Sequence, residues 1–174
     1  MAVIDATVFM GMHHALNDRR QRALKVVMSN FDEGFEISFD QIGICDSIVW
    51  RRPREVQDAY YPFMDVLHTE MPFRRRGYSL ATIERAANDP QLAEIRTSSP
   101  SCALLAASVI EESELLYTFD PVLLKSQPTV RYVACSYGTQ PGGIRSGGSF
   151  PGELQQLYNE SRSLVITEND FGHA

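Results

Sequence analysis

Three cysteines are too few, and too widely spaced, to organise this chain of 174 residues. Cys45, Cys102 and Cys135 are an odd number with no Cys-x-x-Cys pair, which argues against a disulfide framework and against a zinc site. No apolar run approaches the roughly 20 residues that a membrane-spanning helix needs. The N-terminus lacks the basic region of a signal peptide. We therefore expect a reduced, cytoplasmic protein that does not enter the membrane.

Positive charge is also scarce, because 16 Lys and Arg face 22 Asp and Glu and leave a net charge of −6. Nucleic-acid backbones are bound by Lys and Arg, so this balance does not indicate a general nucleic-acid binder. The arginines are clustered, however, in a first group of Arg51, Arg52 and Arg54 and a second at 74–76. Guanidinium groups suit phosphate geometry, and we take the first group as candidate substrate-binding residues.

Strand and helix patterns alternate along the chain, which predicts one α/β domain with a mainly parallel sheet. Apolar runs predict strands at residues 2–9, 35–39, 115–120, 130–137 and 164–167. Periodicity and capping residues predict helices at 15–30, 41–52, 54–70, 79–88, 102–112 and 153–162, with a kink or break at Pro62. We expect a basic connection at 71–78. The Gly-rich loop at 138–152 matches neither a phosphate-binding loop nor a dinucleotide fingerprint.

Two aspartates stand at the ends of predicted strands: Asp5 follows Val3-Ile4, and Asp120 follows Thr118-Phe119. The carboxyl ends of parallel strands form the edge where α/β sheets bind ligands. Two carboxylates that converge there would suit a hard cation. An Asp after a strand is also a common turn residue or helix cap, and the sequence leaves both readings open.

Asp46 is the third carboxylate of interest, because its helical neighbours Ile42, Val49 and Trp50 are apolar. This spacing predicts that Asp46 faces inward, where an unpaired charge is costly and a bound cation would explain it. Asp40 competes for the same role, although we expect it to be the N-cap of this helix.

These motifs resemble the PIN-like domains, a metal-dependent nuclease fold. Asp5 within Val-Ile-Asp-Ala, Asp46 on the helix after the second strand and Asp120 within Thr-Phe-Asp stand where the family carries acids. The resemblance implies a three-layer fold with a mainly parallel central sheet flanked by helices, formed by residues 1–137. Residues 138–174 would add a Gly-rich loop and a C-terminal helical extension packed on the same domain.

The resemblance further implies that Asp5, Asp46 and Asp120 are catalytic residues that hold Mg²⁺ or Mn²⁺ and hydrolyse a phosphodiester, as in a ribonuclease or a related phosphodiesterase. The family's remaining acid is replaced by Cys102, whose neutral thiol is a poor ligand for Mg²⁺. The alternative is therefore a catalytically silent PIN-like protein that binds RNA or a partner protein, or pairs as a homodimer. Metal chemistry on a small molecule is a third reading.

Two further residue types need an interpretation. His13 and His14 are adjacent, and we expect solvated histidines rather than metal ligands, because neighbours in sequence do not share a helix face. Cys102 at the start of an apolar helix is expected to be a small buried residue rather than a nucleophile.

Overall fold

A four-stranded parallel sheet forms the centre of the computed structural model, which describes residues 1–134 and 149–172. The strands are β1 (Ala2–Ile4), β2 (Phe35–Ser38), β3 (Phe73–Arg76) and β4 (Leu116–Tyr117), in the order β3-β2-β1-β4. Each of the three strand pairs is parallel. The predicted α/β class with a parallel sheet is confirmed.

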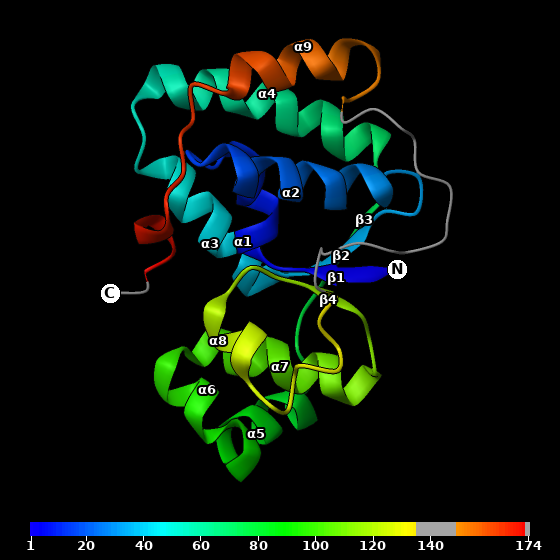
Figure 1. The fold of residues 1–174 in the computed structure, drawn as a ribbon, viewed down its shortest axis with the longest axis vertical. Coiled ribbons are helices and arrows are strands. Elements are labelled where there is room, and N and C mark those ends of the chain that lie inside the picture. Colours follow the sequence, from blue (N-terminus) through cyan, green and yellow to red (C-terminus); the bar gives the residue numbers. More distant parts are fainter. Residues whose placement is uncertain (135–148, 173–174) are drawn as a thin grey trace.

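Helices cover both faces of the sheet and complete a three-layer α/β fold (Figure 1). One layer contains α1 (Ala6–Phe9), η1 (Met10–His13), α2 (Asn17–Ser29), α3 (Phe39–Trp50), α4 (Arg54–Glu70) and α9 (Gly152–Ser161). The other contains α5 (Leu80–Asn88), η2 (Pro90–Leu92), α6 (Ala93–Ser98), α7 (Pro100–Glu112) and α8 (Pro121–Lys125). Within the described ranges, no helix combines the length and apolarity needed to span a membrane.

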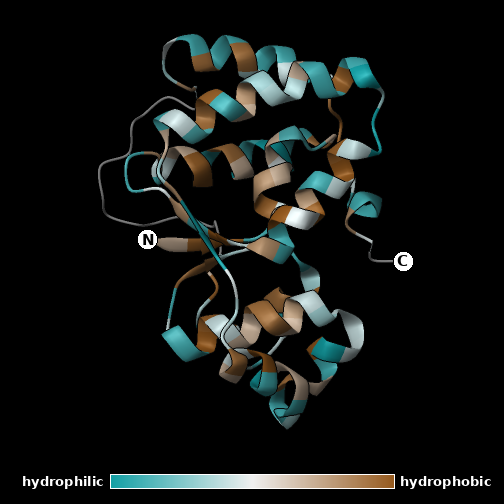
Figure 2. Ribbon diagram, turned by 180° about the vertical axis from the view of Figure 1, so that it is seen from behind, coloured by the Kyte–Doolittle hydropathy of each residue, from teal (hydrophilic) through white to brown (hydrophobic). Residues whose placement is uncertain are grey.

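The alternation of side chains along β1 divides the apolar core in two. Ile4 packs into the larger core with Phe35, whereas Val3 packs into the smaller core with Leu116 and Leu105. Figure 2 shows apolar residues in the strands and in helices on both sides of the sheet. Burying both faces is typical of parallel sheets and explains why β1 and β4 carry no charged residue.

The first predicted strand is too long, because the structure ends it at Ile4 and begins α1 at Ala6. The side chain of Asp5 accepts a hydrogen bond from the backbone N–H of Val8 and caps this short helix. An N-cap carboxylate satisfies backbone donors that an apolar run cannot, so the polar residue overrides the strand pattern.

The structure differs from the sequence-based predictions at three further places. The break predicted as one alternative at Pro62 is absent, since α4 is one helix from Arg54 to Glu70. Residues 71–78 contain the edge strand β3, whose arginines are typical of a charged sheet edge. Helix α6 was not predicted.

The C-terminal predictions are met only in part. In place of a strand at 130–134, Val133 makes a single bridge to Leu116, and in place of a strand at 164–167, Ile166 makes one to His14. The remainder of the predicted strand, 135–137, and loop residues 138–148 lie outside the described residues. Helix α9 packs on α4, and the chain then returns to α3 as η3 (Glu168–Phe171) (Figure 1).

Candidate functional site

The structure brings Asp5 and Asp120 together at the carboxyl edge of the sheet. Asp5 directly follows β1, Asp120 follows the neighbouring strand β4, and both line one cavity of about 40 Å³. Gln41 of α3, Cys102 of α7 and Phe171 of η3 are among its other walls. The site is therefore built from both helix layers and from the C-terminal segment.

Asp5 is 2% exposed, and three donors hold its carboxylate. The Thr7 hydroxyl donates to Oδ1 at 2.6 Å, the Val8 N–H donates to the same oxygen at 3.1 Å, and the Thr118 hydroxyl donates to Oδ2. Burial raises the pKa of Asp5 to about 6, these hydrogen bonds oppose the rise, and the charge of Asp120 adds to it. A carboxyl that titrates this close to neutrality is typical of a functional site.

Asp120 is the N-cap of α8 and is also buried. Its Oδ1 accepts hydrogen bonds from the N–H groups of Val122 at 2.8 Å and Leu123 at 3.3 Å. Its Oδ2 accepts one from the Cys102 thiol at 3.4 Å. Burial and then the charge of Asp120 raise the pKa of Cys102, so the side chain remains a neutral donor. A thiol held in this form is neither a metal ligand nor an activated nucleophile.

Two threonines join the ends of β1 and β4, and neither was predicted from the sequence to be part of the site. Thr7 donates to Asp5 and accepts from the N–H of Phe119 at 2.8 Å. Thr118 also donates to Asp5 and accepts from the N–H of Asp120 at 2.8 Å. The sequence does contain a pattern for this pair. Residues 5–7 read Asp-Ala-Thr and residues 118–120 read Thr-Phe-Asp, so an Asp and a Thr stand two positions apart in both segments, in opposite order.

The prediction that Asp46 faces inward is wrong. Asp46 is exposed on the outer side of α3, beside Trp50, which is 71% exposed. The buried side of α3 instead carries Cys45, Ile48 and Val49. Val49 lies at the border of this buried stripe, so a residue three positions earlier falls outside it. Asp46 does not line the cavity.

Gln41 and Ile44 are the residues of α3 that line the cavity, and Gln41 is the polar one. Its Oε1 accepts from the N–H of Ala6 at 2.9 Å, and its Nε2 donates to the Ser101 hydroxyl at 2.9 Å. Asp40 is not the N-cap of α3, which is Ser38. The Asp40 carboxylate instead accepts from Ser38 at 2.6 Å, from the Tyr78 hydroxyl at 2.8 Å and from Ser101.

The donor set of this site does not fit Mg²⁺ or Mn²⁺. In the described part of the chain, no group of three or more His, Cys, Asp or Glu side chains is arranged to hold a metal ion. Asp5 and Asp120 each already accept three hydrogen bonds from the protein. Small divalent ions require six oxygen ligands in near-octahedral geometry, and few lone pairs remain for them.

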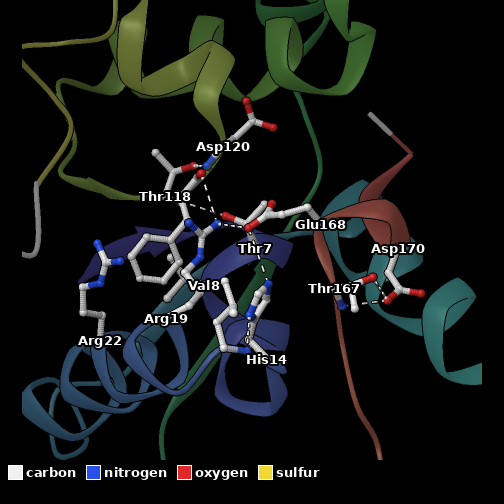
Figure 3. A network of polar contacts seen from close by, with 12 residues as sticks. Thr7, Val8, His14, Arg19, Arg22, Thr118, Asp120, Thr167, Glu168 and Asp170 are labelled. Atoms are coloured by element: carbon white, nitrogen blue, oxygen red, sulfur yellow. Dashed lines mark hydrogen bonds and ion pairs between the residues drawn. The ribbon is translucent and has the colours of Figure 1, made fainter. Parts of the chain in front are cut away.

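The C-terminal segment closes one side of the cavity through Phe171. Glu168 lies 3.3 Å from Arg19 and 3.5 Å from His14 (Figure 3). Asp170 lies 2.5 Å from Arg52. These contacts fix η3 to α2, η1 and the end of α3. We call residues 167–172 the C-terminal strap.

Arg19 connects this strap to the acidic pair. Its Nη2 donates to the carbonyl of Phe119 at 3.2 Å, and its guanidinium carbon lies 4.1 Å from the centre of the Phe119 ring. Figure 3 shows Arg19 between Glu168 and the chain segment that carries Thr118 and Asp120. Burial lowers the pKa of Arg19, whereas the negative charges of Glu168, Asp5 and Asp120 oppose this shift.

The arginines predicted to bind substrate make contacts within the chain. Arg51 donates to the carbonyl of Asp170 at 3.0 Å, and Arg52 pairs with the Asp170 carboxylate. Arg54 pairs with Asp58 at 2.8 Å on the exposed side of α4. In the second group, Arg74 and Arg76 pair with the buried Glu36 of β2. Arg51, Arg52, Arg74 and Arg76 therefore make contacts that connect separate elements of the fold.

The expectation of solvated histidines is wrong for His13 and His14, which are both buried. His13 lies among the rings of Tyr60, Phe63 and Tyr158, with its Nε2 2.8 Å from the Ser161 hydroxyl. Burial, assisted by nearby arginines, lowers the pKa of His13 to about 3. His13 is thus a neutral part of the core.

Comparison with known proteins gives a match to one protein family, which covers almost the whole chain. No curated protein and no solved structure matches the chain. A family model described as a family of unknown function, DUF6190, matches residues 1–171, which include the sheet, both helix layers and most of the C-terminal strap. The chain therefore belongs to the DUF6190 family.

Proposed function

We propose that this chain is a PIN-like protein that has kept the acidic crevice of the fold without its metal-dependent hydrolysis, and that it acts by binding single-stranded RNA. The observation that carries the proposal is the hydrogen bond from the Cys102 thiol to Asp120. The position of a third carboxylate is occupied by a neutral donor, which holds a carboxylate oxygen that a metal would need.

The surroundings of the acidic pair support the same reading. Metal-assisted hydrolysis needs ions that both activate water and contact the phosphate. The cavity of about 40 Å³ has room for a few water molecules, at roughly 10–15 Å³ each by this measure, and not for a phosphodiester. Asp46, the remaining acid of the proposed set, is exposed on α3.

The choice of RNA rests on the resemblance to PIN-like domains and on a basic cleft beside α8. Arg85, Lys125 and Arg131 line this cleft. Local positive charge on a chain of net charge −6 gives a polyanion one preferred place to bind.

The rival within the same fold is a Mg²⁺- or Mn²⁺-dependent ribonuclease that uses Asp5, Asp46 and Asp120. It requires α3 to turn Asp46 toward the cavity when metal and RNA bind. Its signature is RNA cleavage that depends on metal and is abolished by Asp5→Asn.

Binding of a partner protein is a second candidate, because α3 exposes large aromatic side chains. Phe39 is 60% exposed and Trp50 is 71% exposed, and both residue types are enriched in protein interfaces. A second copy of the chain is one such partner, and analytical ultracentrifugation of wild type beside Trp50→Ala tests it.

The test of the proposal is a gel-shift and cleavage assay on labelled single-stranded RNA with Mg²⁺, with Mn²⁺ and with EDTA. We expect wild type to shift the RNA and leave it intact in all three conditions. Metal-dependent shortening of the RNA that Asp5→Asn abolishes would establish the nuclease instead, and the absence of any shift would direct attention to a protein partner.

A further inference from the structure

A cleft of about 850 Å³ lies in the smaller helix layer, on the other side of α8 from the acidic cavity. Pro121, Val122 and Lys125 line the cleft, whereas Asp120 and Leu123 line the cavity. One short helix therefore presents successive residues to both. The cleft is also large enough for a ligand, since binding pockets commonly measure about 300–1,000 Å³.

The chemistry of the cleft favours an anion. Arg85, Lys125 and Arg131 line it, against a single carboxylate from Glu94. Hydroxyl groups and two glutamine amides among the lining residues add neutral donors. Basic residues are therefore concentrated in this cleft, although acidic residues outnumber basic ones in the chain.

Two of the three cations are available for a ligand. Lys125 and Arg131 are exposed, and within the described residues no carboxylate lies at ion-pair distance from either of them. The Arg131 guanidinium carbon lies 4.8 Å from the centre of the neighbouring Tyr132 ring, which orients the side chain without neutralising it. Arg85 is 3.4 Å from Asp89, a loose pair at helical spacing that a phosphate would displace at little cost.

We infer that this cleft binds the phosphate groups of single-stranded RNA, an inference that rests on the proposed function for the kind of ligand. Guanidinium and ammonium groups are the usual partners of phosphate oxygens in proteins. The acidic pair on the other side of α8 repels the same groups, so the cleft, and not the cavity, holds the backbone. A free nucleotide carries the same phosphate chemistry, and the experiment separates the two sources.

The experiment measures fluorescence anisotropy of a labelled single-stranded RNA and, in a parallel arm, displacement by adenosine monophosphate. Lys125→Glu and Arg131→Glu reverse the two available charges, and each should weaken RNA binding about tenfold. Lys25→Glu, on the exposed side of α2, makes the same charge change outside the cleft and should bind as wild type. Glu94→Gln should bind more tightly. Each lost phosphate contact should reduce the slope of log affinity against log salt by about 0.7.

The outcomes separate the cleft from the proposed function. RNA binding that is weakened by Lys125→Glu and Arg131→Glu but not by Lys25→Glu supports both. RNA binding that the cleft variants leave unchanged overturns the cleft and leaves the function standing. Binding of the mononucleotide alone, lost in the cleft variants, supports the phosphate site and overturns RNA as its ligand. Wild type that binds neither ligand overturns both. Circular dichroism of each variant confirms that it is folded.

Discussion

Asp5 is a buried carboxyl whose charge destabilises the folded state. It ionises near 3.8 in the unfolded chain, whereas burial raises its pKa to about 6 after folding. Between these two pKa values Asp5 is protonated in the folded protein and ionised in the unfolded chain. The stability that this proton provides is therefore full below pH 3.8 and is lost as the pH rises through 6. The difference between the two pKa values of Asp5 corresponds to about 3 kcal/mol in free energy of unfolding, since one pKa unit is worth about 1.4 kcal/mol.

Replacing Asp5 with Asn should remove this dependence. Relative to wild type, Asp5→Asn should gain about 2–3 kcal/mol in free energy of unfolding between pH 4 and pH 7.5. Urea unfolding at the two pH values measures the change, with Asp58→Asn on the exposed side of α4 as the control. A stability difference between Asp5→Asn and wild type that is the same at both pH values would show that Asp5 titrates normally.

Cys102 decides whether the acidic pair becomes a metal site. Cys102→Asp places a third carboxylate beside Asp120, at the position of a donor that is 3.4 Å away. We expect a less stable protein without metal, because like charges then share a buried site. For Cys102→Asp, Mn²⁺ at about 100 times its dissociation constant should add about 2.7 kcal/mol to the free energy of unfolding and raise the melting temperature by about 5–10 °C.

The same Mn²⁺ addition should leave the melting temperatures of wild type and Cys102→Ser unchanged in differential scanning fluorimetry. An equal rise in wild type would mean that the thiol does not prevent metal binding. It would also remove the main support for a silent site.

At the scale of elements, the C-terminal strap forms one wall of the cavity through Phe171. Asp170 pairs with Arg52 and accepts hydrogen bonds from the N–H and hydroxyl of Thr167. Asp170→Ala removes these contacts and should free Phe171 from the cavity. In a background with Cys45→Ala and Cys135→Ser, which leaves Cys102 as the one thiol, we expect it to react with a thiol reagent about fivefold faster, since local opening exposes it. Asp58→Ala, which removes an exposed ion pair on α4, should leave the rate unchanged.

The connection between α2 and β2 depends on one glycine. Gly34 has φ +73°, and a Cβ atom there would lie 1.9 Å from the carbonyl oxygen of Pro72, which itself accepts from the N–H of Phe35. Gly34→Ala should lower the free energy of unfolding by about 3 kcal/mol or more, because neither the conformation nor the space suits a side chain.

Gly43→Ala is the matched control for this prediction. A Cβ atom at Gly43 meets nothing within 4 Å, and the residue lies inside α3. The change should stabilise the protein by about 1 kcal/mol. If urea unfolding shows the same loss of stability for Gly34→Ala and Gly43→Ala, the assigned role of Gly34 is wrong.

The elements that the sequence predicted well are those with a strong local signal. Helices α2, α5, α7 and α9 have clear apolar periodicity or an N-cap such as Ser79. The errors arose where tertiary contacts decide the outcome. The edge strand β3 is held by pairs from its arginines to Glu36, and α4, which is not interrupted at Pro62, packs along α9. Neither contact can be read from a short window of sequence.

At the scale of the whole molecule, the sheet order explains which parts of the site were predictable. Asp5 and Asp120 follow neighbouring parallel strands, so strand-end logic was sufficient to bring them together. The orientation of Asp46 depends on how α3 rotates against the sheet, and a shift of one residue in the buried stripe reverses it. The part played by Phe171 depends on the chain returning from α9, which no local pattern indicates.

The most direct test of the central claim is recovery of labelled single-stranded RNA from its complex with wild type in Mn²⁺, beside Asp5→Asn purified identically. We expect both proteins to bind the RNA and release it at full length, because the acidic pair does not act on it. RNA that is shortened by wild type in Mn²⁺, protected by EDTA and left whole by Asp5→Asn would overturn the proposed RNA-binding role and establish a working nuclease.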